Sequence, residues 1–360
     1  MAASSMAHRR ASGIVVGVDT HKDLHVARAK DELGRGLGEI TIPASAKGYR
    51  ALLSWSRALG EVRAFGVEGT GCYGVGLARH LRAHGQVVIE VIRPNRQARR
   101  LRGKSDPADA EAAALAVLSG EASGIPKASD AAVEMIRALR VARSTANRAR
   151  TQAINALHAL VVTAPEELRG ELRGLPGPRL QRVCASLRPG ELTGPVDATK
   201  MALRSLARRH QALSAEVREL DKDLRNLTAQ ACPALVGIFG AGSDTAGALL
   251  LAAGDNPGRL RSEAAFAKLT GVSPVQASSG KTTRYRLNRG GDRHANAALH
   301  RIVLVRLRWR HPPTIDYVAR RTAEGKSKRE IIRCLKRYVA REVYRALTDV
   351  PADASSAART

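Results

Sequence analysis

The chain is poor in cysteine and has no long apolar run. Its four cysteines, spread over 360 residues, never form C-x-x-C, which excludes the usual zinc sites and a disulfide framework. We therefore expect a reducing, intracellular compartment. The N-terminus MAASSMAHRRAS lacks an apolar signal core, and no run of about 18 or more apolar residues occurs. These absences predict a soluble, cytoplasmic protein without a membrane partner.

Aromatic residues are also scarce, at 3% of the chain, and several lie in its basic C-terminal region. They include Tyr285, Trp309, Tyr317, Tyr338 and Tyr344. Such side chains stack on unpaired bases in proteins that bind single-stranded nucleic acid. Burial in a core is the commoner use of these residue types, and it is the role that we expect here.

Acidic residues are too few to balance the basic ones. The chain has 59 Lys and Arg against 33 Asp and Glu, a formal net charge of +26. Residues 1–125 carry 18 basic and 12 acidic side chains, which leaves 41 and 21 for the remainder. A compositional preference for arginine could exchange lysine for arginine, but it would not remove acids. The excess predicts a polyanionic partner, most simply nucleic acid, bound mainly downstream of residue 125.

Residues 13–125 alternate between strand and helix patterns. Three short strand patterns with tight links, from 12 to 44, predict an antiparallel meander. Helix, strand, helix and buried strand follow up to residue 94, and an alanine-rich helix begins at Asp106. The order β-β-β-α-β-α-β-α is that of the ribonuclease-H-like fold, so we expect an α/β domain here.

The rest of the chain reads as all-α. Residues 128–232 hold two long helical patterns around the Pro/Gly-rich connector LRGLPGPR, as in an antiparallel helical hairpin or coiled coil. This hairpin either binds nucleic acid or another protomer, or is a solvated surface feature. Residues 233–347 form a third, mostly helical region that opens with a helix-hairpin-helix-like pattern; a plain tight turn of small residues fits the same pattern. We expect flexible tails at 1–12 and 348–360.

Two carboxylates lie three residues apart in KSDPADAEAAALA. Asp106 and Asp109 could simply cap the helix, with Pro107 at its first position. In a ribonuclease-H-like fold, however, Asp19 ends the first strand and Glu68 ends the fourth, and these strands are neighbours. The last helix packs across their ends, so all four carboxylates meet. Such a cluster repels itself unless Mg²⁺ or Mn²⁺ is bound, and these ions can promote phosphodiester cleavage.

The motifs GVDTHKD, FGVEGTGCYG and KSDPADAEAAALA resemble the D-E-D-D motifs of insertion-sequence transposases with a RuvC-like (Holliday-junction-resolvase-like) N-terminal domain. FAKLTGVSPVQASSGKTTRYRLNRGGDRHANAALH resembles the second block of these transposases, which carries a serine nucleophile. The resemblance covers residues 13–347. It implies a recombinase that cuts and rejoins donor and target DNA and is guided by a structured bridge RNA.

The resemblance also implies the roles of particular residues. Asp19, Glu68, Asp106 and Asp109 would be the catalytic carboxylates and the metal ligands. The nucleophile would be one of two adjacent serines, and the spacing from Pro274 favours Ser279 over Ser278, although a polar turn or a phosphate-cradling loop fits the same letters. Four basic residues that follow would hold the phosphate: Lys281, Arg284, Arg286 and Arg289.

A phosphoserine intermediate would conserve bond energy, so strands could be exchanged without an external energy source. In the resembled family, the carboxylates of one protomer face the serine of another, which implies a homodimer or homotetramer. Two alternatives remain. One is a metal-dependent Holliday-junction-type endonuclease in which water attacks and Ser279 is structural. The other is a basic binding module on an inactive nuclease fold, which the four intact carboxylates argue against.

Overall fold

Five strands of the N-terminal region form one mixed sheet in the order β3-β2-β1-β4-β5. In this computed structural model, residues 13–91, 105–129, 131–280 and 285–348 are described. β1 pairs antiparallel with β2, β2 antiparallel with β3, and β4 parallel with both β1 and β5. The strands are β1 Ile14–Thr20, β2 Leu24–Lys30, β3 Gly36–Pro43, β4 Val62–Glu68 and β5 Val88–Val91. The predicted meander and strand order are confirmed.

Helices cover both faces of this sheet because the residues of β1 alternate between two cores. Val16 and Val18 pack with α1 and α2, whereas Val15 packs with α4. The helices are α1 Ala46–Leu59, α2 Val75–Ala83 and α4 Asp106–Leu118. Every residue of β1 is buried, as expected for a central strand covered on both sides.

A short segment from much later in the chain, Ala253–Arg261, belongs to the same compact unit as residues up to Ala131. Asn256 donates from Nδ2 to the Pro126 carbonyl (3.0 Å) and accepts at Oδ1 from the Ala128 amide (3.0 Å). Arg259 donates to the Ile125 carbonyl (3.1 Å). The segment, which includes the 3-10 turn Pro257–Arg259, therefore completes the edge of the unit around residues 123–128.

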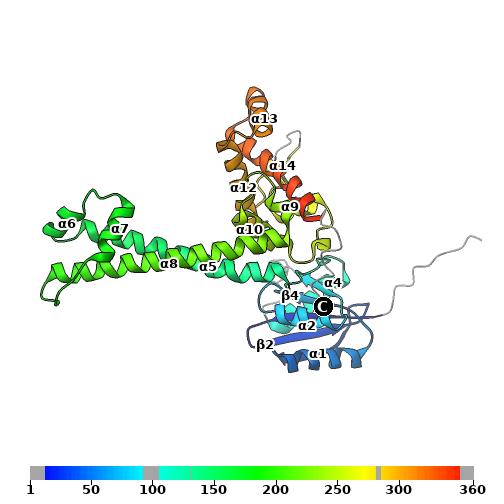
Figure 1. Cartoon of the computed structure of the whole chain (residues 1–360). Helices are drawn as coiled ribbons and strands as arrows, with labels where there is room; N and C mark the ends of the chain where they lie inside the picture. Colours follow the sequence, from blue (N-terminus) through cyan, green and yellow to red (C-terminus); the bar gives the residue numbers. More distant parts are fainter. Residues whose placement is uncertain (1–12, 92–104, 130, 281–284, 349–360) are drawn as a thin grey trace, which may run out of the picture. The chain divides into compact units, whose positions relative to one another are not determined.

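The second unit, Ala132–Ala252 and Ser262–Thr360, is mostly helical. Its long helices α5 and α8 lie side by side, with α6 and α7 at one end of the pair (Figure 1). They run antiparallel, because Arg143 of α5 pairs with Asp221 of α8 while Leu157 shares a core with Leu203. The helices are α5 Ala132–Val162, α6 Glu166–Leu172, α7 Gly177–Ser186 and α8 Pro195–Ala231. The helical hairpin is confirmed, and the Pro/Gly-rich connector forms the turn between α6 and α7.

The remaining elements of the second unit are short helices and one small hairpin. They are α9 Pro233–Val236, α10 Ser243–Ala253, α11 Glu263–Leu269, β6 Val275–Gln276, β7 Tyr285–Arg286, α12 Arg293–Arg308, α13 Pro312–Ala323 and α14 Lys328–Thr348. The predicted α/β domain followed by a mostly helical region is therefore confirmed. The helix-hairpin-helix resemblance stays a prediction. The first helix of this element, α9, has only four residues, and Gly240 with a φ of 90° lies between it and α10.

The three-domain division, 13–125, 128–232 and 233–347, also stays a prediction. The structure has two compact units, and the segment 253–261 joins the first of them. Thr348, expected in a tail, is the last residue of α14. Residues 1–12 and 349–360 lie outside the described part of the chain. None of the described helices is long and apolar enough to cross a membrane.

Candidate active site

Two glycines let α4 lie directly on the sheet. Gly17 of β1 and Gly66 of β4 are paired in register. A Cβ atom on Gly17 would lie 2.0 Å from the carbonyl oxygen of Ala110, and one on Gly66 would lie 2.8 Å from that of Ala113. Any larger side chain would therefore push the helix away. Side chains alternate along a strand, so Asp19 and Glu68, two residues further on, point to the same face as these glycines.

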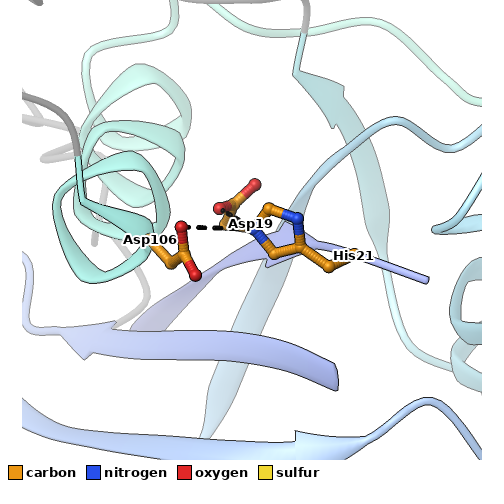
Figure 2. Close-up of side chains that lie close together, drawn as sticks. All are labelled: Asp19, His21 and Asp106. Carbon is orange, nitrogen blue, oxygen red and sulfur yellow. Dashed lines mark hydrogen bonds and ion pairs between the residues drawn. The ribbon is translucent and has the colours of Figure 1, made fainter. Parts of the chain in front are cut away.

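This close packing brings the first turn of α4 to the end of β1. His21 Nε2 lies 3.0 Å from Oδ2 of Asp19 and 3.3 Å from Oδ1 of Asp106 (Figure 2). The three residues each offer one ligand atom, and these atoms lie within 4.8 Å of one another. Two carboxylates and an imidazole form a donor set that suits a divalent cation.

The capping interpretation of Asp106 is wrong in its detail. Ser105 is the N-cap of α4: it is extended (φ −147°, ψ 150°), and its carbonyl accepts from the Asp109 amide at 3.0 Å. Asp106 is the first helical residue and Pro107 the second. The Asp106 side chain is half exposed and directed to His21 (Figure 2). Its position is therefore explained by the cluster at β1 and not by capping.

Asp19 is the most buried member of the cluster, with 9% of its side chain exposed. Burial raises the pKa of its carboxyl, and the neighbouring Asp109 and Asp106 charges raise it further. His21 acts in the opposite direction and lowers this pKa. The carboxylate is thus costly to ionise without a cation nearby.

Glu68 and Asp109 are not part of the group formed by Asp19, His21 and Asp106. Asp109 is buried, and it lies near enough to Asp19 to influence its pKa. Glu68 ends β4 beside the end of β1, where Thr20 Oγ1 donates to the Glu68 carbonyl at 2.8 Å. The four predicted residues therefore come from the adjacent ends of β1 and β4 and from the first turn of α4, and Asp19 and Asp106 both contact His21.

A second contact holds α4 in place. Glu111, in the second turn of the helix, pairs with Lys30 Nζ at 2.7 Å and with Arg28 at 2.6 Å, both on β2. The hydrogen bond from Lys30 is the main reason that the pKa of Glu111 lies below its ordinary value. These ion pairs fix the rotation of α4 about its axis, which decides where Asp106 points.

The predicted serine lies in the second unit. Ser278 and Ser279 are exposed in the segment that joins β6 to β7. Ser278 Oγ accepts a hydrogen bond from Gln276 Nε2 at 3.3 Å. Of the predicted phosphate-binding residues, Arg286 and Arg289 are exposed beside this segment, whereas Lys281 and Arg284 lie outside the described residues.

The base of this hairpin is firmly clamped. Gly291 packs against Gly271 so closely that a Cβ atom would lie 2.2 Å from the Gly271 nitrogen. Asn296 of α12 donates to the Thr270 carbonyl at 2.8 Å and accepts from the buried Lys336 at 2.7 Å. The base of the hairpin is therefore tightly packed, whereas Ser278 and Ser279 are exposed.

Sequence reasoning missed His21. Its position two residues after Asp19 in GVDTHKD was a usable signal, because the residue two positions on in an extended segment points the same way.

Comparison with known families gives two matches. Residues 16–164 match a model described as "Transposase", the D-E-D-D transposase of the IS110 type. Residues 232–319 match a model described as "Transposase IS116/IS110/IS902 family". A search of the curated proteins found no match. The first match contains Asp19, Glu68, Asp106 and Asp109, and the second contains the serine hairpin. The chain therefore belongs to the IS110-type insertion-sequence transposases, enzymes that cleave and transfer DNA strands.

Proposed function

We propose that the chain cuts and rejoins DNA through a phosphoserine intermediate, with Asp19, Glu68, Asp106 and Asp109 holding Mg²⁺ or Mn²⁺. The observation that carries the metal assignment is the convergence of Asp19 and Asp106 on one point, where His21 Nε2 now lies. Oxygen donors at this spacing favour a hard divalent cation. A bound ion supplies Lewis-acid stabilisation of the charge that develops on the phosphodiester.

The nucleophile that we assign is Ser279. Its Oγ attacks phosphorus, the P–O3′ bond breaks, the serine loses its proton and the departing 3′ oxygen gains one. The 3′-hydroxyl of the partner strand then attacks the phosphoserine and restores a DNA linkage, with Ser279 regaining its proton. Arg286 and Arg289, which are exposed beside this segment, would hold the phosphate oxygens during both steps.

Both serines are exposed, and hydrogen bonding favours Ser279 over Ser278 as the nucleophile. Ser278 already accepts a hydrogen bond from Gln276, which fixes its hydroxyl within the hairpin. Ser279 lies at the exposed tip, next to Gly280, whose positive φ of 54° turns the chain. Substrate could therefore approach its hydroxyl directly.

The partners that we assign are donor DNA, target DNA and a structured bridge RNA. The basic excess of the chain downstream of residue 125 supports a large nucleic-acid footprint. A homodimer or homotetramer would let the carboxylates of one protomer and the serine of another act on the same phosphodiester. The reaction would take place in the cytoplasm.

The test is an assay for a covalent protein–DNA adduct that survives denaturation, with Mg²⁺, donor DNA and the copurifying RNA. Wild type should form the adduct, Ser279→Ala should form none, and Ser278→Ala should form nearly the wild-type amount. Cleavage without any adduct in wild type would favour the alternative, a Holliday-junction-type endonuclease that uses water. An adduct that persists in Ser279→Ala and vanishes in Ser278→Ala would move the nucleophile by one residue.

A further inference from the structure

A cavity of about 260 Å³ lies among α12, α13 and α14 of the second unit (Figure 1 labels these helices). Its apolar wall is formed by Val303, Leu335 and Val339, and the rings of Tyr317 and Tyr338 border it. Small-molecule sites commonly measure about 300–1,000 Å³, so this cavity suits a single small ring system. None of its lining residues belongs to the carboxylate cluster or to the serine hairpin.

One exposed aromatic ring lines this cavity and a second contacts a residue that lines it, in a chain with 3% aromatic residues. Tyr338 is 45% exposed and meets Tyr317 edge-to-face at 5.2 Å. Phe239, 48% exposed, stacks at 5.0 Å on His311, which also lines the cavity. Trp309, two residues before His311, is 70% exposed. The expectation that the tyrosine and tryptophan side chains of the C-terminal region serve core packing is therefore wrong for Trp309 and Tyr338, and also for Tyr285, which is 64% exposed.

The surroundings are strongly basic. Residues 293–348 contain 15 basic and 4 acidic side chains. Arg320 lies 5.4 Å from the Tyr317 ring centre, and Arg341 lies 5.3 Å from that of Tyr338. Cations beside aromatic rings are the usual combination at sites for single-stranded nucleic acid, because the rings stack on bases while the cations meet phosphates.

One carboxylate at the cavity is held in a fixed orientation. Arg306, with 7% of its side chain exposed, donates two hydrogen bonds to Glu342, at 2.9 and 2.6 Å. Arg306 also donates to the Phe239 carbonyl at 3.0 Å, so the guanidinium cannot turn. Glu342 itself is 44% exposed, which leaves oxygen lone pairs facing outward. A fixed carboxylate of this kind accepts a hydrogen bond from the amino group of a base such as cytosine.

The Tyr317 hydroxyl is already engaged. Burial, together with a hydrogen bond to Cys334, raises the pKa of Tyr317 to about 12. Its phenol is therefore held within the protein, and what it offers a ligand is its ring.

We propose that this cavity binds one unpaired nucleobase of a single-stranded nucleic-acid segment, stacked on Tyr338 and recognised through its amino group by Glu342. The proposal rests on the proposed function, in which nucleic acid is bound by this chain. It adds a base-reading site to a unit whose other contacts would be to phosphates.

The test is photo-crosslinking of the full-length protein to single strands that contain 5-iodocytosine or 5-iodouracil, with separate RNA and DNA arms. In wild type, crosslinks should map to Tyr338 or Tyr317, and iodocytosine should react roughly fivefold or more better than iodouracil. The arm that reacts identifies the RNA or the DNA as the source of the base. Tyr338→Leu should remove these crosslinks, and Tyr73→Leu, a change at an exposed tyrosine of the first unit, should not.

Glu342→Gln supplies a second, independent readout. The amide would keep one oxygen for Arg306 and replace the other by an NH₂ that donates but does not accept, so the preference should shift from iodocytosine to iodouracil. An unchanged preference would overturn the recognition by Glu342. Two results would overturn the cavity assignment and leave the proposed function standing. One is a single-stranded nucleic acid that binds wild type but crosslinks only to residues outside the cavity. The other is a Tyr338→Leu variant that keeps the crosslinks of wild type. Loss of all nucleic-acid binding in wild type would instead contradict the proposed function.

Discussion

Gly17 lies so close to α4 that a Cβ atom at this position would stand 2.0 Å from the carbonyl oxygen of Ala110. This contact sets the depth at which α4 lies on the sheet. The first turn of the same helix carries Asp106, and the same strand carries Asp19. The distance between the two carboxylates therefore depends on a residue that has no side chain.

Replacing Gly17 with alanine should displace α4 and separate Asp106 from Asp19. Overpacking of this kind costs about 1–3 kcal/mol, and the variant should also bind Mn²⁺ more weakly. Calorimetric Mn²⁺ titration and thermal unfolding would measure both effects. The control is Gly36→Ala, because a Cβ atom at Gly36 meets nothing within 4 Å. If Gly17→Ala binds Mn²⁺ like wild type, the close contact has no influence on the site.

The stability of the sheet should fall at acid pH because of His25. This residue is fully buried, its Nδ1 lies 3.0 Å from the Leu24 carbonyl, and no described residue bonds its Nε2. Burial lowers the pKa of His25 below its ordinary value of 6.5. The unfolded chain therefore takes up the proton more readily. The stabilisation is complete above about pH 6.5 and is lost as the pH falls through the lowered folded pKa.

Hydrogen exchange of the β2 amides, corrected for the intrinsic rate, would follow this loss in the full-length protein between pH 7.5 and 5. His25→Gln should flatten the dependence. His294→Gln, at an exposed position of the second unit, should leave it unchanged. A slope that survives in His25→Gln would assign the acid sensitivity to another group.

Asp244 holds three arginines together in the second unit. It pairs with Arg140 at 2.8 Å, with Arg143 at 3.4 Å and with Arg301. Although burial acts in the opposite direction, Arg140, Arg301 and Arg143 together lower the pKa of Asp244. Asp244→Asn should cost roughly 1–3 kcal/mol in the unfolding of this unit, since three guanidinium groups lose a shared partner that is partly exposed. Asp223→Asn on the exposed face of α8 is the matched change, and equal destabilisation by both would contradict this role.

Nucleic-acid affinity should depend steeply on salt. If roughly six or more phosphates are contacted, affinity should fall about a thousandfold or more between 50 and 200 mM salt. Fluorescence anisotropy with RNA and with DNA would measure the slope. The segment 1–125 should bind much more weakly, and it should be tested together with a peptide of residues 253–261, because these complete the first unit. Comparable binding by this pair would contradict the prediction that nucleic acid binds mainly downstream of residue 125.

The sheet and the order of its strands could be predicted because each strand has a local sequence pattern, an apolar run bounded by glycine-containing turns. The prediction that the four carboxylates lie close together followed from that strand order. The spacing of two residues from Asp19 indicates which way His21 points, but the contact of His21 with Asp106 could not be predicted. Its role depends on where α4 sits, which the sequence does not state.

The return of residues 253–261 to the first unit also escaped prediction. The segment GDNPGRLR carries the signals of an ordinary loop, and its partners are backbone carbonyls and amides near residues 123–128 that no side-chain pattern reveals. The exposure of Tyr338 was missed for a related reason. A tyrosine at helical spacing gives the same pattern whether it faces a core or lines a cavity.

The most direct test of the account is Mn²⁺ binding to the nucleic-acid-free protein, followed by electron paramagnetic resonance. Wild type should bind with saturation, and Asp19→Asn and Asp106→Asn should each weaken binding roughly tenfold or more, since each removes an oxygen donor from one shared site. Asp316→Asn, at an exposed position of α13, should bind like wild type. If Asp19→Asn binds Mn²⁺ as tightly as wild type, the two carboxylates do not form a common metal site and the central claim is wrong.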